Sequence, residues 1–108
     1  LMYLDKQLAH KPVMLAGVSA GRGGHYPLMQ MRVTGYKNSK FVISAENLLV
    51  QGAQDVLNDH DEPEAGSADS SVRKQADYAL RILQQYASAL KQVRDSGVVD
   101  HESFQNGV

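Results

Sequence analysis

The chain has 108 residues, of which 43% are hydrophobic and 21% charged, and its net charge is −1. This length suits one domain or part of one, and the composition is ordinary for a globular protein. The balanced charge gives no electrostatic reason to expect nucleic acid or an anionic membrane as a partner. The chain has no cysteine, which excludes disulfides and thiolate metal sites. No apolar run approaches the ~20 residues that cross a bilayer, so we expect a cytoplasmic protein.

The first residues have the spacing of a helix end, because Leu1, Leu4 and Leu8 recur at helical intervals. Two origins fit this pattern. Either the helix begins upstream of Leu1, or a short helix starts at the terminus itself.

The stretch KPVMLAGVSAGRGGHY, residues 11–26, organises the rest of the chain. Its apolar part, Pro12–Val18, predicts one buried strand of a parallel sheet. Gly17 within that strand indicates that another backbone or a ligand comes close. The loop Ser19–Gly24 then leads into a helix with Pro27 in its first turn. Ligands of parallel sheets bind beyond the carboxyl ends of the strands, so this loop is the candidate site.

Helical and strand patterns alternate after the loop. The helix is expected to carry an apolar stripe and to be interrupted at Gly35. Strands are predicted at 41–44 and 48–50, followed by one helical turn at 53–58. Such alternation predicts a parallel sheet with helical crossovers. The members of the expected stripe are Leu28, Met29, Met31 and Val33.

A long amphipathic helix is predicted over Val72–Asp95, with Gly97 as its stop. The acidic segment before it, residues 58–71, reads as a solvated loop. Ser70 and Ser71 at the end of that loop have N-cap chemistry. Residues 98–108 have no pattern and are expected to form a flexible tail.

The glycines of the loop leave main-chain amides open to a flat or anionic ligand. A tight turn without a ligand is the alternative explanation. The spacing matches neither G-x-G-x-x-G nor the phosphate-binding P-loop, so a phosphate cradle is not supported. The four histidines show no ligand spacing, so no metal site is expected.

The stretch KPVMLAGVSAGRGGHYPLMQMR, residues 11–32, resembles part of the second half of the NAD(P)H-dependent FMN reductases, a family of flavodoxin-like flavoproteins. The resemblance begins with the KPV-apolar strand that runs into a Ser/Gly-rich loop ending in Gly23-Gly24. It continues with the Leu-x-x-apolar-Arg pattern of Leu28 to Arg32, the short strand Phe41–Ser44 and the last amphipathic helix. It spans roughly residues 1–91.

The resemblance implies a flavodoxin-like α/β fold, a three-layer parallel sheet of which residues 1–97 form the C-terminal strand-helix-strand-helix part. It also implies that the loop lies against the pyrimidine edge of an FMN ring and donates amide hydrogens to it. The cofactor-contacting residues would be Ser19, Ala20, Gly21, Arg22, Gly23, Gly24 and His25. For Arg22 the alternative is simple solvation, and for His25 it is capping the start of the helix.

By the same resemblance, the cofactors would be FMN and NAD(P)H, and a hydride would pass from nicotinamide to FMN. Electrons would then reach a small acceptor such as a quinone, a flavin or an azo compound. The cofactor performs this chemistry, so no catalytic side chain is assigned. The family segments that hold the flavin phosphate have no counterpart here. We therefore expect either an N-terminal half upstream or a homo-oligomer.

Two other functions remain open. A flavodoxin-like module that has lost its cofactor could serve in protein assembly, with the long helix packing against a partner. Alternatively, Gly17-Val18-Ser19-Ala20-Gly21 matches the G-x-S-x-G nucleophile elbow of serine hydrolases. That reading requires an acid and a histidine downstream of Ser19, and the candidates are His60 in the acidic loop and His101 in the tail.

Overall fold

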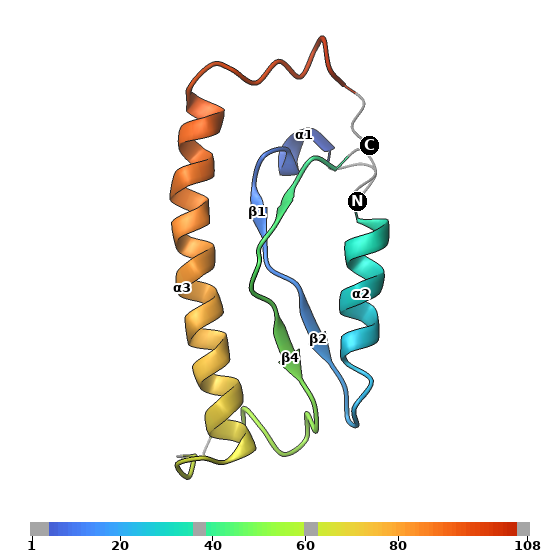
Figure 1. Ribbon diagram of the computed structural model, residues 1–108, viewed down its shortest axis with the longest axis vertical. Coiled ribbons are helices and arrows are strands. Elements are labelled where there is room, and N and C mark those ends of the chain that lie inside the picture. The colour runs from blue at the N-terminus through green and yellow to red at the C-terminus, as the bar shows by residue number, and fades with distance from the viewer. Residues whose placement is uncertain (1–4, 36–38, 60–62, 106–108) are drawn as a thin grey trace.

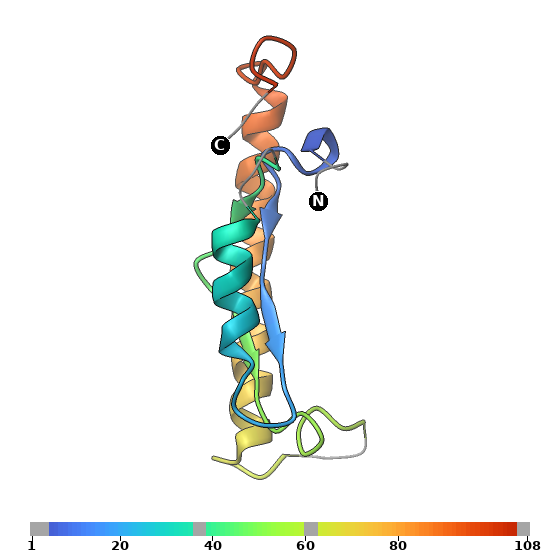
Figure 2. The same cartoon turned by 90° about the vertical axis from the view of Figure 1, so that its right-hand side faces the viewer.

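The computed structural model describes residues 5–35, 39–59 and 63–105. A narrow pair of parallel strands lies between two helices, α2 on one side and α3 on the other (Figures 1 and 2). The strands run in one direction and both helices run back beside them, which confirms the expected α/β architecture with parallel strands. The elements in chain order are α1 (Asp5–Leu8), β1 (Pro12–Val13), β2 (Ala16–Val18), α2 (His25–Thr34), β3 (Val42–Ile43), β4 (Leu48–Val50) and α3 (Ala68–Asp95).

The prediction of one continuous strand over Pro12–Val18 is wrong in one respect. The ladder forms two separate pairs, β1 with β3 and β2 with β4. Two residues separate β1 from β2, whereas four residues, 44–47, separate β3 from β4. The extra residues bulge out of the second strand and interrupt the pairing. Side chains of both helices hold this bulge: Arg32 of α2 donates to Asn47 Oδ1 at 2.8 Å, and Gln75 of α3 donates to the Asn47 carbonyl at 3.2 Å.

Helix α2 has the predicted position, with its C-cap at Gly35, but its predicted apolar stripe is not the buried face. Leu28 alone among its residues is buried, while Met29 is 61% exposed and Val33 is 75% exposed. The reason is that α2 packs on β2 at its N-terminal end, where Gly17 and Gly24 let the two backbones come close. The remainder of the helix presents apolar side chains to the outside.

Helix α3 begins earlier than the sequence predicts. Its N-cap is Ser67, whose side chain accepts a hydrogen bond from the Ser70 amide at 3.1 Å, so Ser70 and Ser71 lie inside the helix. Gly97 has a φ of +81°, which confirms its place just after the helix end. Ala79 at the middle of α3 is fully buried, whereas Leu80 next to it is 53% exposed.

The predicted helical turn at 53–58 is wrong, since these residues form non-helical turns and bends. Leu57 has a φ of +61°, which a helix does not allow, and Val56 is buried beneath the turn. At the N-terminus, Leu1 and Leu4 of the expected helix end lie outside the described residues. The buried apolar side chains are Ala9, Leu15, Leu28, Phe41, Val50, Val56 and Ala79.

Residues 98–105, expected to be part of a flexible tail, cross over the amino-terminal end of the strands (Figure 1). There the Lys40 side chain donates a hydrogen bond to the Phe104 carbonyl. Of the helices in the described part of the chain, none has both the length and the apolar character needed to span a bilayer.

Candidate functional site

The candidate site is the loop Ser19–Gly24, which joins the carboxyl end of β2 to α2 at the lower end of the view in Figure 1. The pairing of the strands extends to the start of this loop, because the Ser19 amide donates to the Val50 carbonyl of the neighbouring strand at 2.9 Å. The next four residues, from Ala20 to Gly23, are exposed. The loop therefore lies where ligands of parallel sheets bind.

Four carbonyl groups of the loop are occupied. The Ser19 and Gly21 carbonyls accept from the amides of Ala53 and Gly52, at 3.0 and 3.3 Å. The Arg22 carbonyl accepts from Gln51 Nε2 at 2.9 Å, and the Gly23 carbonyl accepts from the Tyr26 amide at 3.2 Å. These bonds fix the loop with its carbonyl groups turned toward the protein.

The amides of the loop are not occupied in the same way. Among the described residues, none accepts a hydrogen bond from the amides of residues 20–24. The Ser19 amide differs, because the bond to Val50 makes it part of the sheet. An exposed run of main-chain donors with satisfied acceptors behind it has an affinity for electron-rich ligand edges and anions.

The glycines of this region divide into two groups. A Cβ atom on Gly17 would lie 2.0 Å from the Gly24 carbonyl oxygen, and one on Gly24 would lie 2.9 Å from a Leu49 methyl carbon. Packing of α2 on β2 therefore requires these two glycines, and it accounts for the close backbone approach expected at Gly17. In contrast, Gly21 has nothing within 4 Å of an added Cβ, and Gly23 only the Tyr26 ring at 3.9 Å.

Neither Gly21 nor Gly23 has a positive φ. The fold thus gives no steric or conformational reason for glycine at these two positions. A reason outside the chain, such as a ligand that lies flat on the backbone, is consistent with that observation.

The segment after β4 is the part of the site that sequence reasoning missed. Gln51, Gly52 and Ala53 all donate to carbonyl groups of the loop. The signal was present, since these residues follow the predicted strand 48–50 and the carboxyl ends of parallel strands meet at one edge. Their hydrogen bonds hold the carbonyl side of the loop, and they do not extend the exposed surface of the loop.

His25 and Tyr26 form the start of α2. His25 Nδ1 lies 3.1 Å from the Arg22 carbonyl, and its ring lies 4.2 Å from the Tyr26 ring, centroid to centroid. The start of α2 has no side-chain cap, so the capping alternative for His25 is wrong, and its ring instead lies against a carbonyl of the loop. Tyr26 is 70% exposed and presents its ring beside the loop. Arg22 is also exposed, and among the described residues it forms no ion pair.

The hydrolase alternative requires a histidine beside Ser19. Ser19 Oγ donates to the Gly21 carbonyl at 2.8 Å, and no described histidine bonds to it. His101 lines a cavity with His10, at the opposite end of the strands. His60 lies outside the described residues. The part of the chain that the structure describes does not bring the elements of a triad together.

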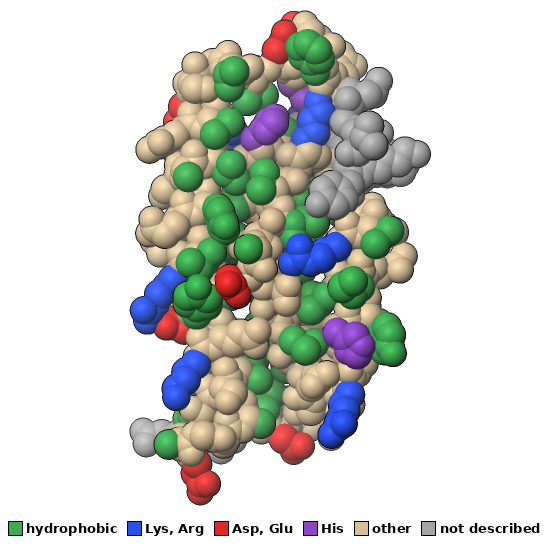
Figure 3. Space-filling model, viewed as in Figure 1, with side chains coloured by type: hydrophobic (Ala, Val, Ile, Leu, Met, Phe, Trp, Pro, Cys, Tyr) green, Lys and Arg blue, Asp and Glu red, His purple; other side chains and the backbone are tan. Residues whose placement is uncertain are grey.

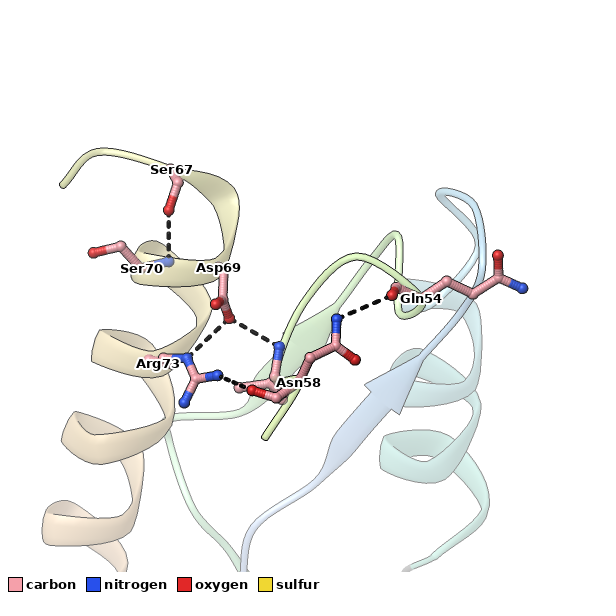
Figure 4. A network of polar contacts seen from close by, with 7 residues as sticks. Gln54, Asn58, Ser67, Asp69, Ser70 and Arg73 are labelled. Carbon is pink, nitrogen blue, oxygen red and sulfur yellow. Dashed lines mark hydrogen bonds and ion pairs between the residues drawn. The ribbon is translucent and has the colours of Figure 1, made fainter. Parts of the chain in front are cut away.

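A polar network ties the segment after β4 to the start of α3 (Figure 4). Asp69 accepts from the Leu57 amide at 2.8 Å and from Arg73 Nε at 3.0 Å, and Arg73 also donates to the Asn58 carbonyl. The hydrogen bond from the Leu57 amide, assisted by Arg73, holds the pKa of Asp69 below its ordinary value despite its burial. The carboxylate therefore fixes the turn at Leu57, whose φ is +61°.

Comparisons with protein-family models, with curated proteins and with solved structures find no match to this chain.

Proposed function

We propose that this chain is the ring-binding part of a flavodoxin-like flavoprotein of the NAD(P)H-dependent FMN reductase type. The observation that carries the proposal is the exposed loop at residues 20–23, whose amides have no acceptor among the described residues, together with glycines at 21 and 23 that the fold does not require. These features suit the edge of an isoalloxazine ring, which offers oxygen and nitrogen acceptors in one plane. The Ser19 amide is engaged in the sheet and has no part in this proposal.

In this proposal the residues of the chain bind and orient. The free amides donate to the electron-rich edge of the ring, and the charge of Arg22 next to them favours added negative charge there. Tyr26, exposed beside the loop, offers an aromatic surface. FMN, when bound, would supply the group that takes a hydride from NAD(P)H and passes electrons to a small quinone, flavin or azo acceptor.

A flavin titration tests the proposal. FMN and riboflavin are added separately to the protein, and the quenching of their fluorescence is measured. We expect saturable binding of both with similar affinity, since the loop contacts the ring edge and not the phosphate. An affinity near ~0.1–1 mM corresponds to the few hydrogen bonds available.

The matched variants are Gly21→Leu and Ala65→Leu. A side chain at residue 21 has free space and no strain in the folded chain, so it should preserve the fold and cover the amides. We expect Gly21→Leu to weaken flavin binding about tenfold or more, and Ala65→Leu, in an exposed turn before α3, to leave it unchanged. Absence of quenching by either flavin, or equal binding by the two variants, would refute the ring-edge assignment.

A second candidate function, assembly with another protein chain, is favoured by the unpaired side of the strands. The amides of Val42 and Ser44 bond to the carbonyls of Lys11 and Val13, and the Leu48 amide bonds to the Leu15 carbonyl. The main-chain N–H and C=O groups of the odd-numbered residues therefore point to the second strand. By the alternation of a parallel ladder, the main-chain groups of Met14, Ala16 and Val18 point to the open side.

Beyond Pro12 at its start, this open side has few of the features that prevent association. No charged residue lies between Pro12 and Val18, whereas the second strand carries Glu46 in its bulge. The Val18 side chain is 62% exposed. On the outside of α2, Tyr26, Met29 and Val33 are exposed at spacings of three and four residues, which makes one apolar stripe. We infer that the chain works as a homo-oligomer paired through the open strand.

A further inference from the structure

A cavity of about 420 Å³ lies at the end of the molecule opposite the candidate flavin loop. It is an open hollow, lined by residues of α1, by the two residues that follow α1, by the end of α3 and by the segment after α3. A second cavity of about 280 Å³ adjoins it and shares His10, Val99 and His101 as walls. Figure 3 shows histidine side chains close to a Lys or Arg side chain toward the upper end of this face.

The walls of the larger cavity carry an excess of cationic and donor groups. Lys6, His10, Arg94 and His101 line it, and Glu102 is the single carboxylate among the described residues of its wall. Ala9 and Val99 form the apolar part of the wall. The whole chain has a net charge of −1, so this local excess of positive charge is not a general property of the surface.

Two of these groups have donor capacity that the described residues do not use. Arg94 donates through Nη1 to the His10 carbonyl at 2.9 Å, which anchors the guanidinium, and no described residue accepts from its other N–H groups. His101 Nε2 is buried and has no hydrogen-bond partner among the described residues. A buried polar atom without a partner is costly, and a ligand that bonds to it removes that cost.

The acidic groups nearby offset part of this charge. Asp100 lines only the smaller cavity, and its carboxylate accepts from the amide of Ser103 at 3.0 Å. That hydrogen bond holds the pKa of Asp100 below its ordinary value, because it stabilises the ionised form, so Asp100 opposes an anion in the smaller cavity and not directly in the larger one. Glu102 is exposed and so competes weakly with a bound anion.

We propose that this cavity binds a small molecule through its phosphate group. Its donors come from four segments: α1, the bend at His10, the end of α3 and the segment that follows it. Donors from separate directions suit a tetrahedral dianion better than a planar carboxylate. The cavity is larger than one phosphate group, and its apolar wall leaves room for a small organic part.

Calorimetric titration of the protein with inorganic phosphate, glycerol 3-phosphate and acetate tests the proposal. We expect both phosphate compounds to bind and acetate to bind at least about tenfold more weakly. Tighter binding of glycerol 3-phosphate than of inorganic phosphate would identify a metabolite as the ligand, and equal binding would identify the free ion. No phosphate binding below about 10 mM, or acetate binding as tight as phosphate, would overturn the proposal.

The variants separate a built site from general charge. Lys6→Gln and His101→Phe should each weaken phosphate binding about tenfold. Lys74→Gln removes the same charge from an exposed position near the other end of α3 and should have no effect. Glu102→Gln should tighten binding about threefold, because it removes a carboxylate from the wall of the cavity.

Circular dichroism identifies any variant that fails to fold. Glu102→Gln should tighten phosphate binding, a result that loss of the fold would not produce. Equal weakening by Lys74→Gln and Lys6→Gln, or no tightening by Glu102→Gln, would show that phosphate does not occupy this cavity. The flavin proposal does not depend on the result, since the two sites lie at opposite ends of the strands.

Discussion

At Gly17, an added Cβ atom would lie 2.0 Å from the Gly24 carbonyl oxygen and 3.0 Å from the Leu28 side chain. The obstacle is backbone, which cannot move without shifting the start of α2. Four residues later, the loop glycine at residue 21 has nothing within 4 Å of the same atom. The two positions therefore separate glycine needed for packing from glycine that the fold leaves unexplained.

Gly17→Ala should destabilise the protein by about 2 kcal/mol, because α2 must move away from β2. Gly21→Ala, the matched control, should change the free energy of unfolding by less than about 0.5 kcal/mol. Urea unfolding followed by circular dichroism measures both. Equal stability of the two variants would show that the close contact of α2 with β2 is not part of the folded state.

Asp69 gives the protein a predicted dependence on pH. Its pKa is lowered in the folded state by the Leu57 amide and by Arg73, so its ionised form stabilises folding. This contribution is complete above the ordinary aspartate pKa of ~3.9, and it is lost as the pH falls from there through the lower folded value.

Asp69→Asn should therefore lower the melting temperature at neutral pH and flatten its decline in acid. The control is Asp77→Asn, which removes an exposed carboxylate that pairs with Arg81 on the same helix. That variant should behave as the parent does, since exposed ion pairs contribute little. Parallel melting curves against pH for the parent and Asp69→Asn would contradict the role assigned to this carboxylate.

Among the elements, α3 shows how one side chain determines the residue at which a helix begins. Ser67 has extended backbone angles and caps the Ser70 amide, and Asp69 adds negative charge to the first turn. Serines 70 and 71 carry the same cap chemistry in the sequence but lie within helical backbone. The choice among three serines depends on which one the preceding loop leaves extended.

Ser67→Ala should cost about 1 kcal/mol of stability, because the Ser70 amide loses its acceptor. Ser71→Ala should be neutral or slightly stabilising, since alanine is the better residue within a helix. Thermal unfolding of the two variants makes the comparison. A larger loss for Ser71→Ala than for Ser67→Ala would move the helix start to the position that the sequence suggested.

At the scale of the whole molecule, two strands do not make a closed structure. Within the described residues, no strand pairs with the open side of β1 and β2. A second copy, turned about a twofold axis at Ala16, would place Met14 opposite Val18 of its partner. Every outward main-chain group of β2 would then meet a complementary group in an antiparallel ladder.

The chain has no cysteine, so an introduced one reports on this contact alone. Paired residues in such a ladder have Cα atoms about 5.5 Å apart, which a disulfide can bridge. Ala16→Cys should form a disulfide-linked dimer under mild oxidation, while Ala45→Cys, exposed in the bulge of the second strand, should not. Monomers for both variants, or equal cross-linking of both, would refute pairing through this strand.

The sequence by itself determined the order and type of the main elements. Proline and the β-branched residues of the strands, the glycine-rich loop, the repeat of the long helix and Gly97 at its end each act through local geometry. The position of the candidate loop after the first strand follows from the same local signals. The family resemblance rests on the sequence alone, and the flavin function is a proposal that the amides and glycines of the loop support.

Tertiary structure decided what local signals cannot encode. The break between β1 and β2 comes from extra residues in the other strand, about thirty positions away, and Arg32 and Gln75 hold that bulge from two helices. Which of the glycines pack and which stay open depends on how closely α2 approaches β2. The cationic cavity exists only because the segment after α3 returns to α1. These features are set by distances between segments far apart in the chain, and the hydrophobic period of one segment carries no information about them.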